Sequence, residues 1–268
     1  MVGERPALWY NRKDQRGREW SQVVDIHCHI VPEVDDGAWD MDTAVAMARI
    51  AEGCGVNKII ATPHFKGIPE ELEALPYMKQ QFRRLQSAVK RELPRLELIF
   101  GMEVLCVPQT IEMARHGLLP TMGNTRYVLT EFYFDAGASF MDAALEEMRS
   151  CGYLPVVAHP ERYAAVQRDP GLAGRWFERG IVLQLNKGSI LGAFGRRAED
   201  TALRLLYRGM AHVIASDAHS PQIRTTDLGG VQQWCLDHLG REYTKILLEE
   251  NPGRIAKGRP MRAVHREH

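Results

Sequence analysis

The chain has 268 residues, of which 45% are hydrophobic and 25% charged, as expected for a globular protein with a large core. Its 34 basic residues balance its 34 acidic residues, so the net charge favours neither a nucleic acid nor a membrane as a partner. No apolar run approaches the roughly 20 residues that cross a bilayer, and residues 1–22 lack the apolar stretch of a secretory signal. Five cysteines without paired spacing fit a reducing compartment, so we expect a cytoplasmic protein without membrane insertion or a nucleic-acid partner.

Seven short apolar or β-branched runs predict buried strands. In chain order they start at residues 23, 58, 96, 126, 154, 181 and 212 and read VVDIH, KIIATPH, LELIFGMEV, RYVLTEF, LPVVAHP, IVLQLN and HVIASDAH. Segments with helical periodicity separate them, for example 43–55, 140–152 and 196–209, and each of these three ends at a glycine. Strand–helix units at intervals of about 30 residues indicate a parallel sheet. With no linker and no internal repeat, we predict a single α/β domain folded as a closed or nearly closed barrel, with an open doubly wound sheet as the alternative.

The two ends of the chain fall outside this pattern. We assign residues 1–22 to an N-terminal extension, 23–260 to the barrel and 261–268 to a C-terminal tail. The extension carries Trp9, Tyr10 and Trp20 among basic residues. It is therefore either a loosely ordered, flexible tail or a segment that docks on the barrel or on a partner.

Metal-type side chains stand at the predicted carboxyl ends of six of the seven strands. They are His27, His29, His64, Glu103, Glu131, His159, Asp217 and His219, whereas the sixth strand ends in Asn186 without an obvious ligand. Any one of these residues alone is more often structural, but parallel strands deliver their carboxyl ends to one mouth, so their concurrence predicts a common site. Alternation along a strand turns His27 and His29 to the same side and Cys28 away from them. The same rule pairs Asp217 with His219.

The charges of this cluster predict bound cations. Asp36, Glu103, Glu131 and Asp217 would bring four carboxylates into one pocket, where they raise one another's pKa values or repel unless cations lie between them. Two or three divalent ions would neutralise that charge. Imidazole and carboxylate donors without a thiolate favour Mn, Fe or Zn over Cu(I) or an iron–sulfur cluster.

Several motifs together resemble a known family. They are DIHCHIVPEVDDG from residue 25, IIATPHF, GMEV, LTEF, VVAHPERY and ASDAH, and the resemblance extends from about residue 24 to the segment at 251–258. The chain is similar to the polymerase and histidinol phosphatase (PHP) superfamily. Within that superfamily it most resembles the PHP-type bacterial protein tyrosine phosphatases of capsule and exopolysaccharide operons, the CpsB/YwqE-like group. Family members start with the metal motif almost at the N-terminus, whereas about two dozen residues precede it here.

The resemblance implies a distorted (β/α)7 barrel and a cluster of up to three metal ions, usually taken as Mn²⁺. It implies nine metal ligands: His27, His29, Asp36, His64, Glu103, Glu131, His159, Asp217 and His219. Asp35 replaces Asp36 if the turn is shifted by one residue. Arg162 and Arg224 correspond to phosphate-binding arginines, although a structural salt bridge to Glu161 or to a barrel carboxylate is the alternative for Arg162.

The expected reaction is hydrolysis of phosphotyrosine in a protein by a hydroxide that bridges two metals, without a phosphoenzyme. The arginines would stabilise charge on the phosphoryl oxygens, and the general acid is left open between His29, His64 and a metal-bound water. The family implies a bacterial tyrosine kinase of polysaccharide biosynthesis as the substrate. Histidinol phosphate, a nucleic-acid 3′ end and a metal-stabilised module without turnover are the alternatives.

A second phosphatase pattern occurs near the C-terminus. Residues 235–241 read CLDHLGR, which has the Cys-to-Arg spacing of thiol-based tyrosine phosphatases. That chemistry needs a loop of backbone N–H groups around the phosphate at the start of a helix. Here the preceding residues predict a helix with Val231, Trp234 and Cys235 on one apolar face, ended by Gly240. We therefore expect Cys235 to be a core residue.

Overall fold

The computed structural model describes residues 22–262. Within this range all paired strand segments run parallel to one another. The segments are β1 (Val23–Cys28), β2 (Val56–Ala61), β3 (His64–Phe65), β4 (Glu97–Phe100), β5 (Glu103–Leu105), β6 (Tyr127–Glu131), β7 (Leu154–Ala158), β8 (Val182–Asn186) and β9 (Val213–Ala215).

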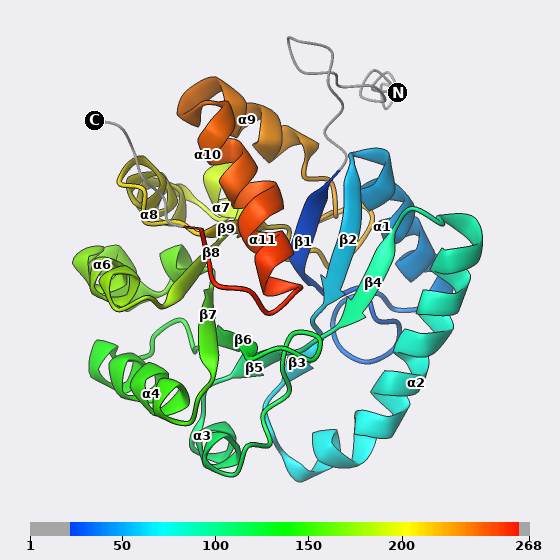
Figure 1. Cartoon of the computed structure of the whole chain (residues 1–268), viewed down its shortest axis with the longest axis horizontal. Helices are drawn as coiled ribbons and strands as arrows, with labels where there is room; N and C mark the ends of the chain where they lie inside the picture. The colour runs from blue at the N-terminus through cyan, green and yellow to red at the C-terminus, as the bar shows by residue number, and fades with distance from the viewer. Residues whose placement is uncertain (1–21, 263–268) are drawn as a thin grey trace.

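Helices alternate with these strands, and most of them surround the strands on the outside, as Figure 1 shows. Those that follow β1 to β6 are α1 (Met41–Gly53), α2 (Pro69–Glu92), α3 (Pro108–Arg115) and α4 (Ala138–Ser150). The later ones are η1 (Pro160–Arg162), α5 (Ala164–Arg168), α6 (Gly171–Glu178), α7 (Lys187–Ile190), α8 (Arg196–Tyr207), α9 (Gly229–Leu239), α10 (Arg241–Lys245), η2 (Ile246–Glu250) and α11 (Asn251–Ile255). The helices expected at 43–55, 140–152 and 196–209 are confirmed as α1, α4 and α8. None of the described helices has the length and apolar character needed to cross a membrane.

The nine segments correspond to the seven predicted strands, two of which are interrupted. A break at Thr62 and Pro63 separates β2 from β3, where proline has no N–H to donate to the ladder. Gly101 and Met102 separate β4 from β5 at the same level. Backbone hydrogen bonds continue across both breaks, from Gly101 N to the Ala61 carbonyl (2.8 Å) and from Glu103 N to the Pro63 carbonyl (3.0 Å).

The strands close into a ring through contacts between the last and the first. The hydrogen-bonded order is β1-β2-β4 in one sheet and β3-β5-β6-β7-β8-β9 in the other. Beyond β9, Asp217 N donates to the His27 carbonyl (2.8 Å) and His29 N donates to the Ala218 carbonyl (2.9 Å). The predicted distorted barrel is thereby confirmed, and the open doubly wound sheet is not formed.

Two apolar clusters hold the barrel together. The larger one fills the space between the helices and the strands and includes Met47, Leu85 and Leu205. The smaller one gathers Ile60, Leu129 and other strand residues with Ile255 of α11, which Figure 1 shows across the centre of the ring. Burying each such side chain stabilises the fold by about 1.5–3 kcal/mol.

The described range starts just before β1 and ends with two residues that pack against the barrel. Residue 22 leads into β1, and residues 1–21 and 263–268 lie outside the described residues, so most of the expected extension and tail is not covered. Met261 packs against the smaller apolar cluster. Arg262 pairs with Glu242 and Glu250 at 2.6 Å each.

Candidate metal centre

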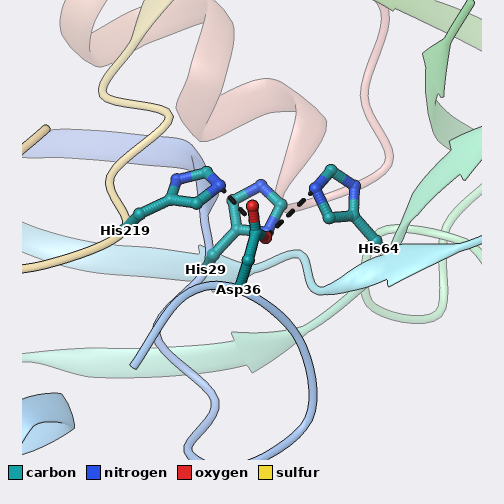
Figure 2. A group of neighbouring side chains, drawn as sticks. All are labelled: His29, Asp36, His64 and His219. Carbon is teal, nitrogen blue, oxygen red and sulfur yellow. Dashed lines mark ion pairs between the residues drawn. The ribbon is translucent and has the colours of Figure 1, made fainter. Parts of the chain in front are cut away.

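All nine side chains predicted as metal ligands converge at the carboxyl ends of the strands. Their nitrogen and oxygen atoms form four overlapping groups, and within each group the donor atoms lie within 4.8 Å of one another. The groups are His29, Asp36, His64 and His219; His27, His29 and Asp217; His27, Glu103 and His159; and His64, Glu103 and Glu131. Figure 2 shows the first group, with Asp36 Oδ1 between His64 Nε2 (3.4 Å) and His219 Nε2 (3.5 Å).

Glu103 is the carboxylate shared by most of the cluster. It begins β5 and is buried, and its Oε1 lies 3.2 Å from both His27 Nε2 and His159 Nε2. Its Oε2 lies 3.1 Å from His64 Nδ1 and 3.3 Å from His29 Nε2. One carboxylate therefore faces four imidazoles that come from three strand ends, those of β1, β3 and β7.

The donor atoms fit a divalent cation. His27 Nε2 and His29 Nε2 face each other at 3.2 Å, and Asp217 Oδ1 lies 3.4 and 3.6 Å from them. Aromatic nitrogens and carboxylate oxygens that converge without a thiolate suit Mn, Fe or Zn. Cys28 is turned into the larger apolar cluster, as the alternation along β1 predicts.

Residues behind the cluster hold the imidazole rings in place. Asp35 Oδ2 accepts from His29 Nδ1 (2.7 Å) and from His64 N (3.1 Å), and Gln184 Oε1 lies 2.9 Å from His27 Nδ1. A partner on the remote ring nitrogen selects the tautomer and raises the basicity of the nitrogen that faces a metal. The structure thus puts Asp36 at the mouth and Asp35 behind His29.

Two amides of β8 belong to this supporting layer, and the sequence reasoning missed both. Besides Gln184, Asn186 Nδ2 donates to Asp217 Oδ2 at 2.6 Å. Asn186 N also donates to Glu161 Oε1 (2.9 Å). The sequence feature that could have indicated them is the presence of two amides in an otherwise apolar, buried strand, because buried polar groups need hydrogen-bond partners.

The two predicted phosphate-binding arginines lie at the edge of the same cluster. Arg162 Nη1 is 3.4 Å from Asp217 Oδ2, and Arg224 Nη2 is 2.5 Å from Asp217 Oδ1. Their side chains are 19% and 29% exposed, so both guanidinium groups reach the open side of the site. The salt bridge considered as the alternative for Arg162 is present, and its partner is the barrel carboxylate Asp217.

Comparison with known proteins identifies the family. The family model described as capsular polysaccharide synthesis, CpsB/CapC, matches residues 23–257. The chain belongs to the CpsB/CapC family. Tyrosine-protein phosphatase YwqE of Bacillus subtilis is 33% identical over 202 residues, 75% of this chain and 79% of the relative. Tyrosine-protein phosphatase CpsB of Streptococcus agalactiae is 27% identical over 241 residues, 88% of this chain and 98% of the relative.

A solved structure of the same family has the same fold. Crystal structures of YwqE from Bacillus subtilis and CpsB from Streptococcus pneumoniae are described as unique metal-dependent tyrosine phosphatases. The match has 30% sequence identity and a TM-score of 0.78, and it covers 91% of this chain and all of the other. The resemblance to the PHP-type tyrosine phosphatases of capsule operons is therefore confirmed.

Mutual interactions shift the acid–base equilibria in this CpsB/CapC site. Burial opposes ionisation of Asp217, but the charges of His27, His159 and Arg224 outweigh it and lower its pKa to about 2. Burial, and then the charge of Glu103, raise the pKa of Glu131 to about 7. Neighbouring positive charges thus hold Asp217 ionised, while burial and the charge of Glu103 oppose ionisation of Glu131.

Backbone strain is concentrated around the site. Four non-glycine residues in the described range have a positive φ, and three of them belong to the predicted site: His159 (34°), Asp217 (50°) and Arg224 (54°). Such conformations cost on the order of 1–3 kcal/mol each and persist where surrounding contacts enforce them. Lys187 Nζ helps to hold the Arg224 loop by donating to the carbonyl oxygens of Thr225 and Asp227.

The Cys-to-Arg pattern at 235–241 has no part in this site. Cys235 is buried on α9, and burial raises the pKa of its thiol to about 12, so a thiolate nucleophile does not form there. The helix ends at Gly240. The expectation that Cys235 is a core residue of this CpsB/CapC protein is confirmed.

Proposed function

We propose that this protein is a metal-dependent protein-tyrosine phosphatase that uses a cluster of two or three divalent ions, most readily Mn²⁺. The observation that carries the proposal is the convergence of nine imidazole and carboxylate side chains beside two partly exposed arginine side chains. The names of the similar proteins YwqE and CpsB support the choice of tyrosine phosphatase over other hydrolases.

The ligands would be the nine residues of the predicted set, His27, His29, Asp36, His64, Glu103, Glu131, His159, Asp217 and His219. Divalent ions bound by them supply a water of lowered pKa and positive charge for the phosphoryl oxygens. Asp35 and Gln184 keep the rings of His29 and His27 in the orientation that ligation needs.

Arg162 and Arg224 bind and orient the phosphoryl group. Planar guanidinium groups donate two parallel hydrogen bonds to phosphate oxygens, which also stabilises charge that develops during hydrolysis. When a phosphate dianion enters, it replaces Asp217 as the partner of these arginines. Of the two imidazoles considered as general acid, His64 has the more exposed side chain, 31% against 0% for His29. Because both imidazoles belong to the proposed ligand set, a metal-bound water is the third candidate for the acid.

The substrate we propose is a phosphotyrosine protein, in particular a bacterial tyrosine kinase of capsule or exopolysaccharide biosynthesis. The description of the CpsB/CapC family as a family of capsular polysaccharide synthesis supports this choice. We also propose a cytoplasmic location, because all five cysteines are free thiols in the structure and fit a reducing compartment.

The test is turnover with Mn²⁺ on three substrates, beside elemental analysis of the purified protein. We expect two or three equivalents of metal and hydrolysis of a phosphotyrosine peptide well above that of histidinol phosphate or a phosphodiester. Preference for histidinol phosphate or the phosphodiester would assign the site to another PHP-class reaction. Metal binding without hydrolysis of any of the three would make the protein a metal-stabilised module.

A cysteine variant separates this chemistry from the thiol mechanism. We expect Cys235→Ser to keep kcat/KM for the phosphotyrosine peptide within about 2-fold of the wild type, because the buried thiol touches no substrate. Chelation should abolish the activity of both proteins. Loss of activity in Cys235→Ser together with resistance to chelation would contradict the metal mechanism.

A further inference from the structure

Two phenylalanine rings enclose the guanidinium group of Arg162. Its Cζ lies 4.6 Å from the centroid of the Phe134 ring and 4.3 Å from that of the Phe194 ring. Phe134 comes from the loop between β6 and α4, and Phe194 from the loop between α7 and α8. A cation within about 6 Å of a ring centroid is attracted by the negative face of the ring. Two loops that are 60 residues apart in the chain therefore meet at one arginine of the proposed phosphate site.

Both rings are held in these positions by their surroundings. Ala164 N donates to the Phe134 carbonyl at 2.8 Å, which ties the Phe134 loop to the turn that carries Arg162. The Phe194 ring lies over Gly188, where an added Cβ would be 2.6 Å from its Cε2 atom. The glycine therefore leaves the space that Phe194 occupies. The Phe134 loop is therefore fixed by a backbone hydrogen bond, and the Phe194 ring is fixed by packing on Gly188.

Phe134 is exposed to solvent and Phe194 is partly exposed. Phe134 is 46% exposed although its centroid lies only 6.0 Å from that of the buried His159 ring. Contact with water is unfavourable for a large apolar side chain, and a ligand that covers the side chain removes this unfavourable contact. An exposed aromatic face next to a guanidinium group suits a ligand with both an aryl ring and an anion.

We propose that Phe134 and Phe194 form an aromatic clamp that selects aryl phosphates, and phosphotyrosine in particular, over alkyl phosphates. This inference rests on the proposed function. With the phosphoryl group on Arg162, the group attached through the ester oxygen lies beside the two rings. A phenyl ring there makes offset or edge-to-face contacts at centroid distances of about 4.5–7 Å, which a serine side chain cannot make. The clamp thus contacts the leaving group while the arginine binds the phosphate.

Binding of two phosphonates to the Mn²⁺-loaded protein tests the clamp without turnover. We expect the wild type to bind phenylphosphonate more tightly than methylphosphonate. Phe134→Leu and Phe194→Leu, which keep apolar bulk but remove the ring, should each reduce that ratio of Kd values by about 2- to 12-fold. The ratio of kcat/KM for phosphotyrosine and phosphoserine peptides of one sequence should fall in parallel.

Two further variants complete the design. Tyr207→Leu removes an aromatic side chain of similar exposure at the far end of α8, away from the strand ends that form the site, and should leave both ratios unchanged. Gly188→Ala should lower both ratios, because its methyl group displaces the Phe194 ring from Arg162. Metal content and melting temperature of each variant show whether the barrel and its cluster are intact.

The outcomes for the clamp and for the proposed function are distinct. An unchanged phenyl-to-methyl ratio in both phenylalanine variants, or equal loss of binding for the two phosphonates, would overturn the clamp. So would a wild type that binds both phosphonates equally. A wild type that fails to hydrolyse the phosphotyrosine peptide would reject the proposed function, and the phosphonate ratios would still decide whether the clamp exists.

Discussion

Asp35 and Asp36 show how far two identical neighbours can differ at the scale of single residues. Asp35 is mostly buried and binds His29 Nδ1 and two backbone N–H groups, whereas the exposed Asp36 faces His64 and His219. The first can fix a tautomer, and the second can reach a cation from the solvent side. The chemistry of a carboxylate in this site is therefore decided by which atoms surround it.

Glu131 gives a pH prediction for the metal-free protein. Its pKa in the folded state is about 7, against about 4.3 for an unperturbed glutamate. Between these values the folded state holds a proton that the unfolded state has released, so this residue makes stability fall as pH rises from about 4.5 to 7. Glutamine cannot take up this proton, so the wild type should lose more stability than Glu131→Gln between pH 5 and pH 8. We expect the difference between their unfolding free energies to change by on the order of 2–3 kcal/mol in favour of the variant.

Urea unfolding of both chelated proteins at the two pH values measures this difference. Glu178→Gln, at the end of α6, is the control and should show no such change. A Glu131→Gln curve parallel to that of the wild type across this pH range would contradict the raised pKa.

At the scale of elements, the loop between β1 and α1 carries two of the proposed ligands, His29 at its start and Asp36 further along. Ala38 N donates to the His29 carbonyl at 3.0 Å, which folds the loop back on the end of the strand. Gly37 lies so close to this point that an added Cβ would be 2.0 Å from the His29 oxygen and 2.5 Å from the His29 Cβ. Since backbone cannot yield as a flexible side chain can, only glycine fits at position 37 against His29.

Gly37→Ala should therefore disrupt the metal site from within this loop. We expect at least a 10-fold loss of Mn²⁺ affinity, as for mutations that misorient ligands from behind, together with a lower melting temperature. Gly137→Ala is a matched control, because a Cβ there meets nothing within 4 Å and the backbone φ of −73° suits any residue. Titration of Mn²⁺ into each apo-protein measures the affinity, and equal affinities in the two variants would contradict the close fit at Gly37.

At the scale of the whole molecule, the carboxylates of the candidate site lie together where the strands end. Glu103, Glu131 and Asp217 come from three strand ends, and among the described residues imidazoles and the two arginines offset their charges. Ions bound to the folded state alone stabilise the entire barrel by mass action, by about 2.7 kcal/mol at a free concentration of 100 times Kd.

Chelation should accordingly lower the melting temperature of the protein. For a chain of this size, about 2.7 kcal/mol corresponds to a decrease of roughly 5–11 °C. Differential scanning calorimetry with and without EDTA measures the shift, and re-addition of Mn²⁺ should reverse it. An unchanged melting temperature with metal loss verified by elemental analysis would mean that the cluster does not stabilise the fold.

The sequence by itself determined the parallel strand–helix order and the side chains that converge at the strand ends. Periodicity two turns His27 and His29 to one side of a strand, and parallel strands bring their carboxyl ends together, so local patterns and one topological rule were sufficient. Only the tertiary structure decided which atoms oppose one another: Asp35 behind His29, Gln184 behind His27, and Phe194 against Arg162. The physical reason is that spacing encodes direction within a strand, whereas contacts across 157 residues, as from His27 to Gln184, depend on how every intervening element packs.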